Sequence, residues 1–201
     1  MQGAGYVLAG GSSTRMGTDK AVLIHEGRPI VATIASRIEE VIGNVTLVGA
    51  PERYGSLGLR LIPDLRHNCG PIGGIEAALV DGRAPINVIV SCDVPGVHAD
   101  WIRAVYDCAV ESQAQCVVCR DITGRVHPLL AAYRDDCLPV FQEALDQGRL
   151  RLMDALKSFT VATVDIPAEL SNVNTNEDWQ SWISSYQSDH AGVMHARRST
   201  S

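Results

Sequence analysis

A glycine-rich loop directly behind a short apolar run is the feature that most constrains this chain. Residues 6–9 have the length and apolarity of a buried strand, and Gly10 and Gly11 interrupt it. Glycine tolerates positive φ and lets the backbone approach a ligand closely. Arg15 and Lys20, in the same loop, offer a planar fork and a mobile point charge for phosphate oxygens. The segment therefore predicts a strand followed by a polyphosphate-binding turn.

Two better-known phosphate loops do not fit this segment. A P-loop requires Gly-Lys followed directly by Ser or Thr, whereas Gly17 is followed here by Thr18, Asp19 and Lys20. The dinucleotide fingerprint places G-x-G-x-x-G between a strand and a helix, whereas this loop has adjacent glycines and then a long polar segment. An ordinary glycine-rich turn is the alternative. The presence of Arg15, Gly17 and Lys20 in one loop favours ligand binding.

The rest of the chain alternates between strand-like and helix-like segments. Strand-like runs occur at residues 45–48, 59–62, 86–90 and 115–120, and helical periodicity at residues 30–41 and 75–80. This alternation predicts right-handed crossovers and a parallel sheet. A turn at residues 122–125 predicts a hairpin and at least one antiparallel strand. We therefore expect a three-layer α/β/α sandwich with a mostly parallel mixed sheet, formed by one domain (residues 1–187) and followed by a disordered tail (residues 188–201).

Composition excludes several classes of protein. The formal net charge of −6 argues against a nucleic-acid partner, which requires a basic face. No apolar run approaches the roughly 18 residues of a membrane span, and no secretory signal is visible. The six cysteines suit free thiols of a reducing cytosol, so we expect a cytoplasmic protein. Cys116 and Cys119 have a zinc-like spacing, but alternation along a strand directs their sulfurs to opposite faces.

Two acids stand at the ends of strand-like runs. Asp64 follows the run at residues 59–62, and Asp93 follows the run at residues 86–90. Open α/β sheets bind ligands at the carboxyl ends of their parallel strands. Asp93 suits Mg²⁺, which prefers oxygen ligands, although a helix-capping or turn role is the alternative. With Arg15 and Lys20, these acids predict nucleotidyl or phosphoryl transfer, which depends on positioning and charge neutralisation.

The signature loop also carries a family resemblance. It resembles the loop of nucleotidyltransferases with the glycosyltransferase-A-like fold, and within them the MobA family of molybdenum cofactor guanylyltransferases. The matching pattern is Leu8-Ala9-Gly10-Gly11-x-Ser13-x-Arg15-Met16-Gly17-x-Asp19-Lys20-Ala21. The resemblance covers residues 6–182 and implies a Rossmann-like nucleotidyltransferase fold. It also implies Mg²⁺-dependent transfer of GMP from GTP to molybdopterin, release of pyrophosphate, and transient contacts with cofactor-biosynthesis proteins and molybdoenzyme chaperones.

The resemblance assigns roles residue by residue. The catalytic set is Arg15, Lys20 and Asp93, with Asp93 as the metal ligand. The GTP side comprises Leu8, Ala9, Gly10, Gly11, Lys20, Asp64 and Asp93. The pterin side comprises His127, Arg151, Asn172 and Asn174. For the pterin-side residues, the competing roles are a turn at the start of a strand, a solvated helix charge and a helix N-cap.

Base preference depends on two positions. Cytidylyltransferases for the same cofactor resemble this loop but have alanine where this chain has Gly10, and the smaller residue leaves room for a purine. The family often has asparagine after the second strand, where this chain reads Val48-Gly49-Ala50-Pro51. That contact is lost or made by the backbone. A sugar-1-phosphate nucleotidyltransferase and a non-enzymatic GTP-binding adaptor are two further candidates for a chain with this loop.

Overall fold

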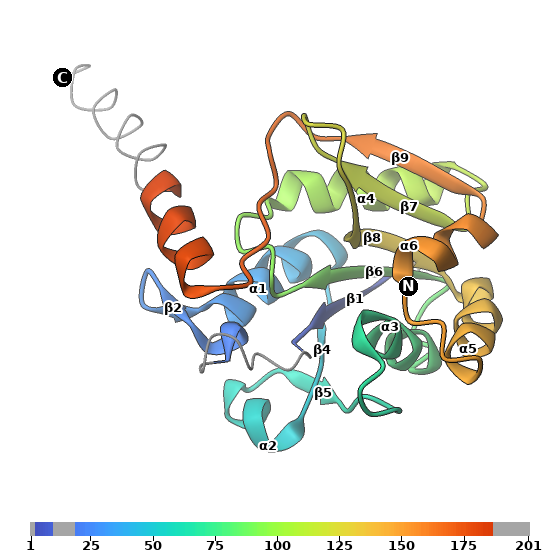
Figure 1. Cartoon of the computed structure of the whole chain (residues 1–201), viewed down its shortest axis with the longest axis horizontal. Coiled ribbons are helices and arrows are strands. Elements are labelled where there is room, and N and C mark those ends of the chain that lie inside the picture. The colour runs from blue at the N-terminus through green and yellow to red at the C-terminus, as the bar shows by residue number, and fades with distance from the viewer. Residues whose placement is uncertain (1–2, 10–18, 187–201) are drawn as a thin grey trace.

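A seven-stranded sheet forms the centre of the molecule (Figure 1). The computed structural model describes residues 3–9 and 19–186. Across the sheet the strands lie in the order β5 (Arg60–Ile62), β4 (Thr46–Val48), β1 (Gly3–Leu8), β6 (Ile86–Ser91), β8 (Val126–Arg134), β7 (Cys116–Arg120) and β9 (Val161–Asp165). β8 is antiparallel to both of its neighbours, whereas the other strand pairs are parallel. The predicted mostly parallel mixed sheet is therefore confirmed.

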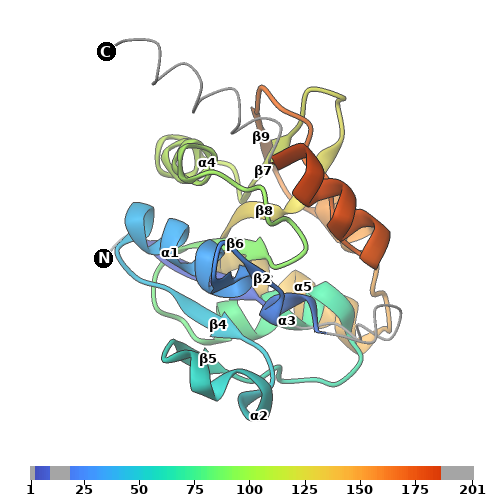
Figure 2. The same ribbon diagram turned by 90° about the vertical axis from the view of Figure 1, so that its left-hand side faces the viewer.

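Helices cover both faces of the sheet (Figure 2). One face packs against α1 (Ile30–Ile42) and α4 (Ala99–Glu111). The other face packs against α3 (Gly70–Val80), α5 (Leu138–Asp146) and the short α6 (Leu152–Ala155). The central strands β1 and β6 are buried along their whole length, as expected for parallel strands covered on two sides. These layers confirm the predicted three-layer sandwich.

The two sulfurs of the Cys116–Cys119 pair lie in different cores. Cys119 packs on the face covered by α1 and α4, and Cys116 packs on the opposite face. The prediction that strand alternation separates them is confirmed. Within the part of the chain that the structure describes, no helix has the length and apolarity needed to cross a bilayer. The boundary between one domain and a tail stays a prediction, since residues 188–201 lie outside the described residues.

The carboxyl ends of the parallel strands are flush. Leu8 pairs with Val48 on one side and with Ser91 on the other, and Val48 pairs with Ile62. The ladder continues past these pairs, because the N–H of Cys92 donates to the Leu8 carbonyl at 3.0 Å. We call this edge the carboxyl rim. Because β8 runs in the opposite direction, its first residues, rather than its last, reach this rim.

A small hairpin holds the C-terminal helix beside the rim. β2 (Ile24–His25) pairs with β3 (Arg28–Pro29), and residues 176–186 form a helix that lies next to the hairpin in Figure 1. The His25 ring packs edge-on against Trp182 and Tyr186, at centroid distances of 4.7 and 4.6 Å. This contact anchors the helix and thereby the residues that precede it, including Asn172 and Asn174.

Candidate active site

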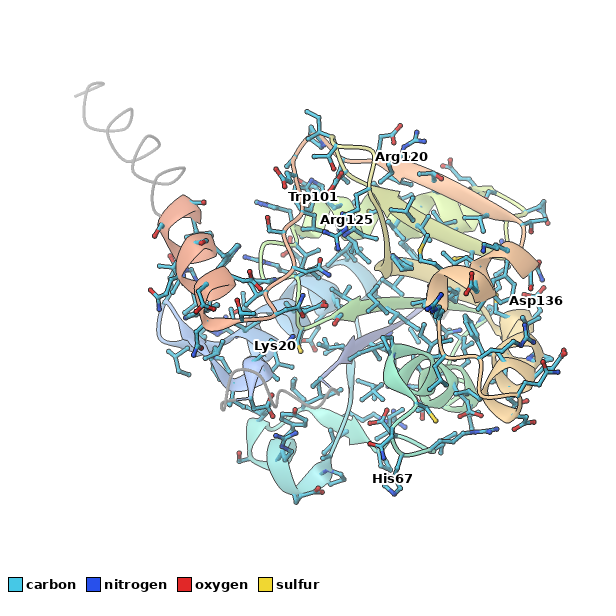
Figure 3. The ribbon with its side chains drawn as sticks, in the orientation of Figure 1. Lys20, His67, Trp101, Arg120, Arg125 and Asp136 are labelled. Atoms are coloured by element: carbon cyan, nitrogen blue, oxygen red, sulfur yellow. The ribbon has the colours of Figure 1, made fainter. Side chains whose placement is uncertain are left out.

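Lys20 lies at the carboxyl rim, beyond the tips of β1 and β6 (Figure 3). It begins a helical turn, Lys20–Val22, which the Asp19 side chain caps by accepting a hydrogen bond from the N–H of Ala21 at 3.1 Å. The Lys20 ammonium donates to the Val173 carbonyl and to Oδ1 of Asn174, both at 3.0 Å. A predicted phosphate-binding residue and a predicted pterin-side residue are therefore in direct contact.

Tyr54 connects the two described ends of the signature loop. It is the last residue of α2 (Pro51–Tyr54), and its hydroxyl lies 2.6 Å from the Ala9 carbonyl oxygen and 2.7 Å from Oδ2 of Asp19. Burial, followed by the hydrogen bond to Asp19, raises the pKa of Tyr54, so the phenol stays protonated. A side chain at Gly49 would start 2.8 Å from the Tyr54 ring. Glycine at that position therefore makes room for Tyr54.

Asp93 follows β6 and is held by the segment that follows β9. Its carbonyl accepts from the N–H of Val173 at 2.7 Å, and its Oδ2 accepts from Nδ2 of Asn172 at 3.4 Å. The other two side-chain oxygens, Oδ1 of Asp93 and Oδ1 of Asn172, are buried and have no hydrogen-bond partner among residues 3–9 and 19–186. A buried acceptor without a donor is costly. The pair therefore points to a ligand that offers a hydrogen-bond donor or a positive charge.

The chemistry of these two oxygens fits a hard divalent cation. Mg²⁺ binds oxygen ligands, keeps several waters and commonly uses one or two carboxylates together with substrate phosphates. Among the described residues, no cluster of three or more His, Cys, Asp and Glu side chains could hold a metal ion on its own. A cation at Asp93 would accordingly complete its coordination with nucleotide and water oxygens.

A cavity of about 440 Å³ opens beside Asp93. Its walls are largely apolar, with charged and polar groups among them. The lining residues are Asp93, Val94, Arg125, Val126, His127, Pro128, Leu129, Met153 and Asn172. Its size lies within the range of small-molecule sites. The cavity brings together two predicted pterin-side residues, His127 and Asn172, with the predicted metal ligand.

His127 is paired with a buried carboxylate. Its Nε2 lies 2.9 Å from Oδ2 of Asp121, the residue that follows β7. The side chains of His127 and Asp121 are 4% and 1% exposed, so the pair is shielded from water. Burial alone would raise the pKa of Asp121, but hydrogen bonds from Thr123, His127 and the backbone hold it well below its usual value. Asp121 is therefore an ionised acceptor.

The glycine-rich first part of α3 packs against β1. Asp64 follows β5 at the rim and is half-buried, and this burial raises the pKa of its carboxyl. A side chain at Gly74 in α3 would start 3.2 Å from the Leu8 side chain. This close approach supports helix–sheet packing as one role of the segment. Asp64 and Leu8 nevertheless border the same rim, as predicted.

Gly10, Gly11 and Arg15 are outside the described residues. Arg151 caps the start of α6, is exposed, and does not belong to the cavity lining. Its predicted pterin contact stays a prediction.

Sequence reasoning missed Asp121, Tyr54, Arg125 and Met153. Only Asp121 had a usable signal, because it is a third acid directly after a strand-like run. The rule that identified Asp64 and Asp93 applies to it equally.

A lysine, a strand-end acid whose Oδ1 has no partner among the described residues, and an adjoining cavity share the carboxyl rim of this sheet. Together with the match to a family model, they make the chain a nucleotidyltransferase. The chain belongs to the MobA-like NTP transferase family, whose domain model matches residues 5–166.

Individual relatives agree with this assignment. A molybdenum cofactor guanylyltransferase from Serratia proteamaculans is 31% identical over 185 residues, covering 89% of this chain and 92% of the relative. Molybdopterin-guanine dinucleotide biosynthesis protein A from Archaeoglobus fulgidus superposes with a TM-score of 0.74 at 20% identity, covering 89% and 95% of the two chains. A Mycobacterium tuberculosis protein solved in complex with manganese superposes with a TM-score of 0.65 at 19% identity, covering 90% and 97%.

Proposed function

We propose that this chain transfers GMP from GTP to molybdopterin and releases pyrophosphate. The observation that carries the proposal is the contact of Lys20 with Asn174 beside the Asp93 cavity. It joins the end of the signature loop to a pocket that could hold a second substrate. The similarity to relatives named as molybdenum cofactor guanylyltransferases supports the choice of both substrates.

In the proposed reaction, a phosphate oxygen of molybdopterin attacks the α-phosphorus of GTP. A new P–O bond forms, the bond from the α-phosphorus to the bridging oxygen breaks, and pyrophosphate departs with the electron pair. The attacking phosphate is already an anion, so the reaction requires no strong general base. Arg15 and Lys20 would bind the β- and γ-phosphates and stabilise the leaving group. Leu8, Ala9, Gly10, Gly11 and Asp64 would bind the nucleoside.

We propose Mg²⁺ as the metal, held through Oδ1 of Asp93 with Oδ1 of Asn172 beside it. When bound, the ion supplies charge neutralisation to the phosphates. The side chains have separate tasks. Lys20 contacts Val173 and Asn174 at the rim, and the Asp93 carboxylate accepts from Nδ2 of Asn172 and so orients that side chain.

The cavity is proposed as the pterin site. Its apolar wall suits the faces of a fused ring, and His127 and Asn172 offer hydrogen bonds at the ring edge. Arg125 supplies a cation for the phosphate of the acceptor.

A nucleotide competition assay tests the reaction. The protein is given molybdopterin, Mg²⁺ and each of the four nucleoside triphosphates in turn, and pyrophosphate release is measured. We expect turnover to be fastest with GTP. Faster turnover with CTP would make the chain a cytidylyltransferase; the absence of asparagine at Val48-Gly49-Ala50-Pro51 is the reason to test base preference directly. Turnover with hexose 1-phosphates would support a sugar nucleotidyltransferase, and GTP binding without any turnover would support an adaptor.

We also propose a cytoplasmic location and transient contacts with cofactor-biosynthesis proteins and molybdoenzyme chaperones. All six cysteines are free in the structure, which suits a reducing compartment.

A further inference from the structure

We propose that Asp121 is a positioning residue that holds His127 with a bare Nδ1 facing the cavity, where it accepts a hydrogen bond from an N–H group on the edge of the pterin ring. The ligand half of this inference rests on the proposed function. The positioning half does not, because it concerns the free protein.

Apart from the contact with His127, the Asp121 carboxylate is the acceptor in each of its described hydrogen bonds. Oδ1 accepts from the backbone N–H and the hydroxyl of Thr123, at 2.9 and 2.6 Å, and from the N–H of Arg125 at 3.0 Å. Oδ2 accepts from the N–H of Leu170 at 3.5 Å and faces Nε2 of His127 at 2.9 Å. An ionised carboxylate has no proton to give. Nε2 must therefore carry the hydrogen.

A hydrogen on Nε2 leaves Nδ1 of neutral His127 with a lone pair. Among the described residues Nδ1 has no hydrogen-bond partner. It is also not one of the fully buried polar atoms that lack a partner, so Nδ1 keeps some exposed surface. His127 lines the cavity while its Nε2 faces Asp121, so Nδ1 is assigned to the side of the ring that borders the cavity. A bare nitrogen there favours a ligand N–H or O–H and disfavours a phosphate oxygen.

The Asp121 carboxylate also contacts the segment after β9, because its Oδ2 accepts from the N–H of Leu170 at 3.5 Å, and backbone hydrogen bonds reinforce this junction. The N–H of Ile122 donates to Ala168 at 3.3 Å, and the N–H of Ile166 donates to Arg120 at 2.9 Å. These bonds join the turn after β7 to the segment after β9. That segment leads to Asn172, whose Nδ2 contacts Asp93. Asp121 thus lies at the junction of two chain segments that both face the cavity.

The turn at residues 121–125 does not by itself require a histidine beside Asp121. Oδ1 satisfies the donors of Thr123 and Arg125, whereas Oδ2 turns toward a histidine on the cavity wall. This division of the two oxygens makes Asp121→Asn a sharp test. Only the amide oxygen can accept from the turn donors, so the amide nitrogen must face Nε2 of His127. When this amide N–H donates to Nε2, Nε2 becomes an acceptor and the hydrogen of the neutral imidazole moves to Nδ1. Nδ1 then presents a donor to the cavity in place of an acceptor.

The experiment combines imidazole ¹⁵N NMR of the free full-length protein with steady-state kinetics. We expect the wild type to show the Nε2–H form of His127 and Asp121→Asn to show the Nδ1–H form. We also expect Asp121→Asn to raise the KM for molybdopterin about tenfold and leave the KM for GTP unchanged. The matched control is Asp165→Asn, since Asp165 is an exposed strand-end carboxylate paired with Arg120. It should change neither the tautomer nor the two KM values.

His127→Gln provides a second variant if Asp121→Asn does not fold. A glutamine amide can still donate to Asp121 but has no atom in place of Nδ1, so the KM for molybdopterin should rise about tenfold here too. An unchanged KM would overturn the ligand half. An Nδ1–H tautomer in the wild type would overturn the positioning half. Absence of any wild-type turnover with GTP and molybdopterin would instead refute the proposed function and, with it, the ligand half alone.

Discussion

The Lys20 ammonium lies 3.0 Å from Oδ1 of Asn174, a residue 154 positions further along the chain. The lysine closes the nucleotide loop, and the asparagine belongs to the segment that borders the cavity. A single hydrogen bond therefore joins the two halves of the proposed reaction site. It also gives the amine a defined position before substrate arrives, which reduces the ordering cost of binding.

Replacing the Lys20 ammonium should lower turnover and have little effect on the free energy of unfolding. We expect Lys20→Met to lower kcat/KM about 100-fold or more, because a charged donor to the phosphates is lost. Pyrophosphate release measures the effect. Lys157→Met is the control, since Lys157 pairs with Asp154 on the surface and should leave turnover unchanged. Near-normal activity of Lys20→Met would contradict the assigned role.

Oδ1 of Asp93 and Oδ1 of Asn172 have no hydrogen-bond partner in the described ranges, and as proposed metal ligands they predict weaker metal binding when either residue is replaced. We expect Asp93→Asn to abolish nearly all metal-dependent turnover. We expect Asn172→Ala to weaken the binding of Mn²⁺, measured by electron paramagnetic resonance in the presence of GTP, by about tenfold. Asp100→Asn, in the first turn of α4, is the control. Unaltered Mn²⁺ affinity in both variants would place the metal elsewhere.

The contacts of Tyr54 predict that loss of its hydroxyl impairs the binding of GTP and leaves the binding of molybdopterin unchanged. Tyr54→Phe keeps the ring against Gly49 but removes the hydroxyl that contacts Ala9 and Asp19. We expect the free energy of unfolding to fall by about 1 kcal/mol and the KM for GTP to rise, with no change in the KM for molybdopterin. Tyr106→Phe serves as the matched control, since Tyr106 is a half-buried tyrosine in α4 and belongs to no predicted site. A defect seen only with molybdopterin would refute this interpretation.

The raised pKa of Tyr54 also predicts an alkaline effect on stability. Burial and the Asp19 hydrogen bond favour the neutral phenol in the folded state. The folded pKa lies above the unfolded value of about 10, so this stability is complete below about pH 10 and is lost as the pH rises further. Urea unfolding between about pH 8 and pH 11 should show a shallower alkaline loss for Tyr54→Phe than for Tyr106→Phe. If the free energy of unfolding falls equally with pH in the two variants, the pKa of Tyr54 is not raised in the folded state.

Sequence patterns predicted the parts of the site that depend on strand direction. The positions of Asp64 and Asp93 at one edge follow from a parallel sheet, and the hairpin at residues 122–125 follows from its turn residues. Contacts between distant segments were beyond such reasoning. The Asp121–His127 pair requires β7 and β8 to align across a register shift between Val118 and Cys119. The approach of Lys20 to Asn174 depends on where the C-terminal helix docks.

The direction of β8 has one more consequence. A hairpin, and not a crossover helix, delivers its first residues to the cavity wall. An insertion or deletion in that hairpin would reshape the wall while leaving the strands that present Leu8 and Asp64 in place. An enzyme organised in this manner can acquire a new acceptor by altering a few surface residues and retain the machinery that activates its nucleotide.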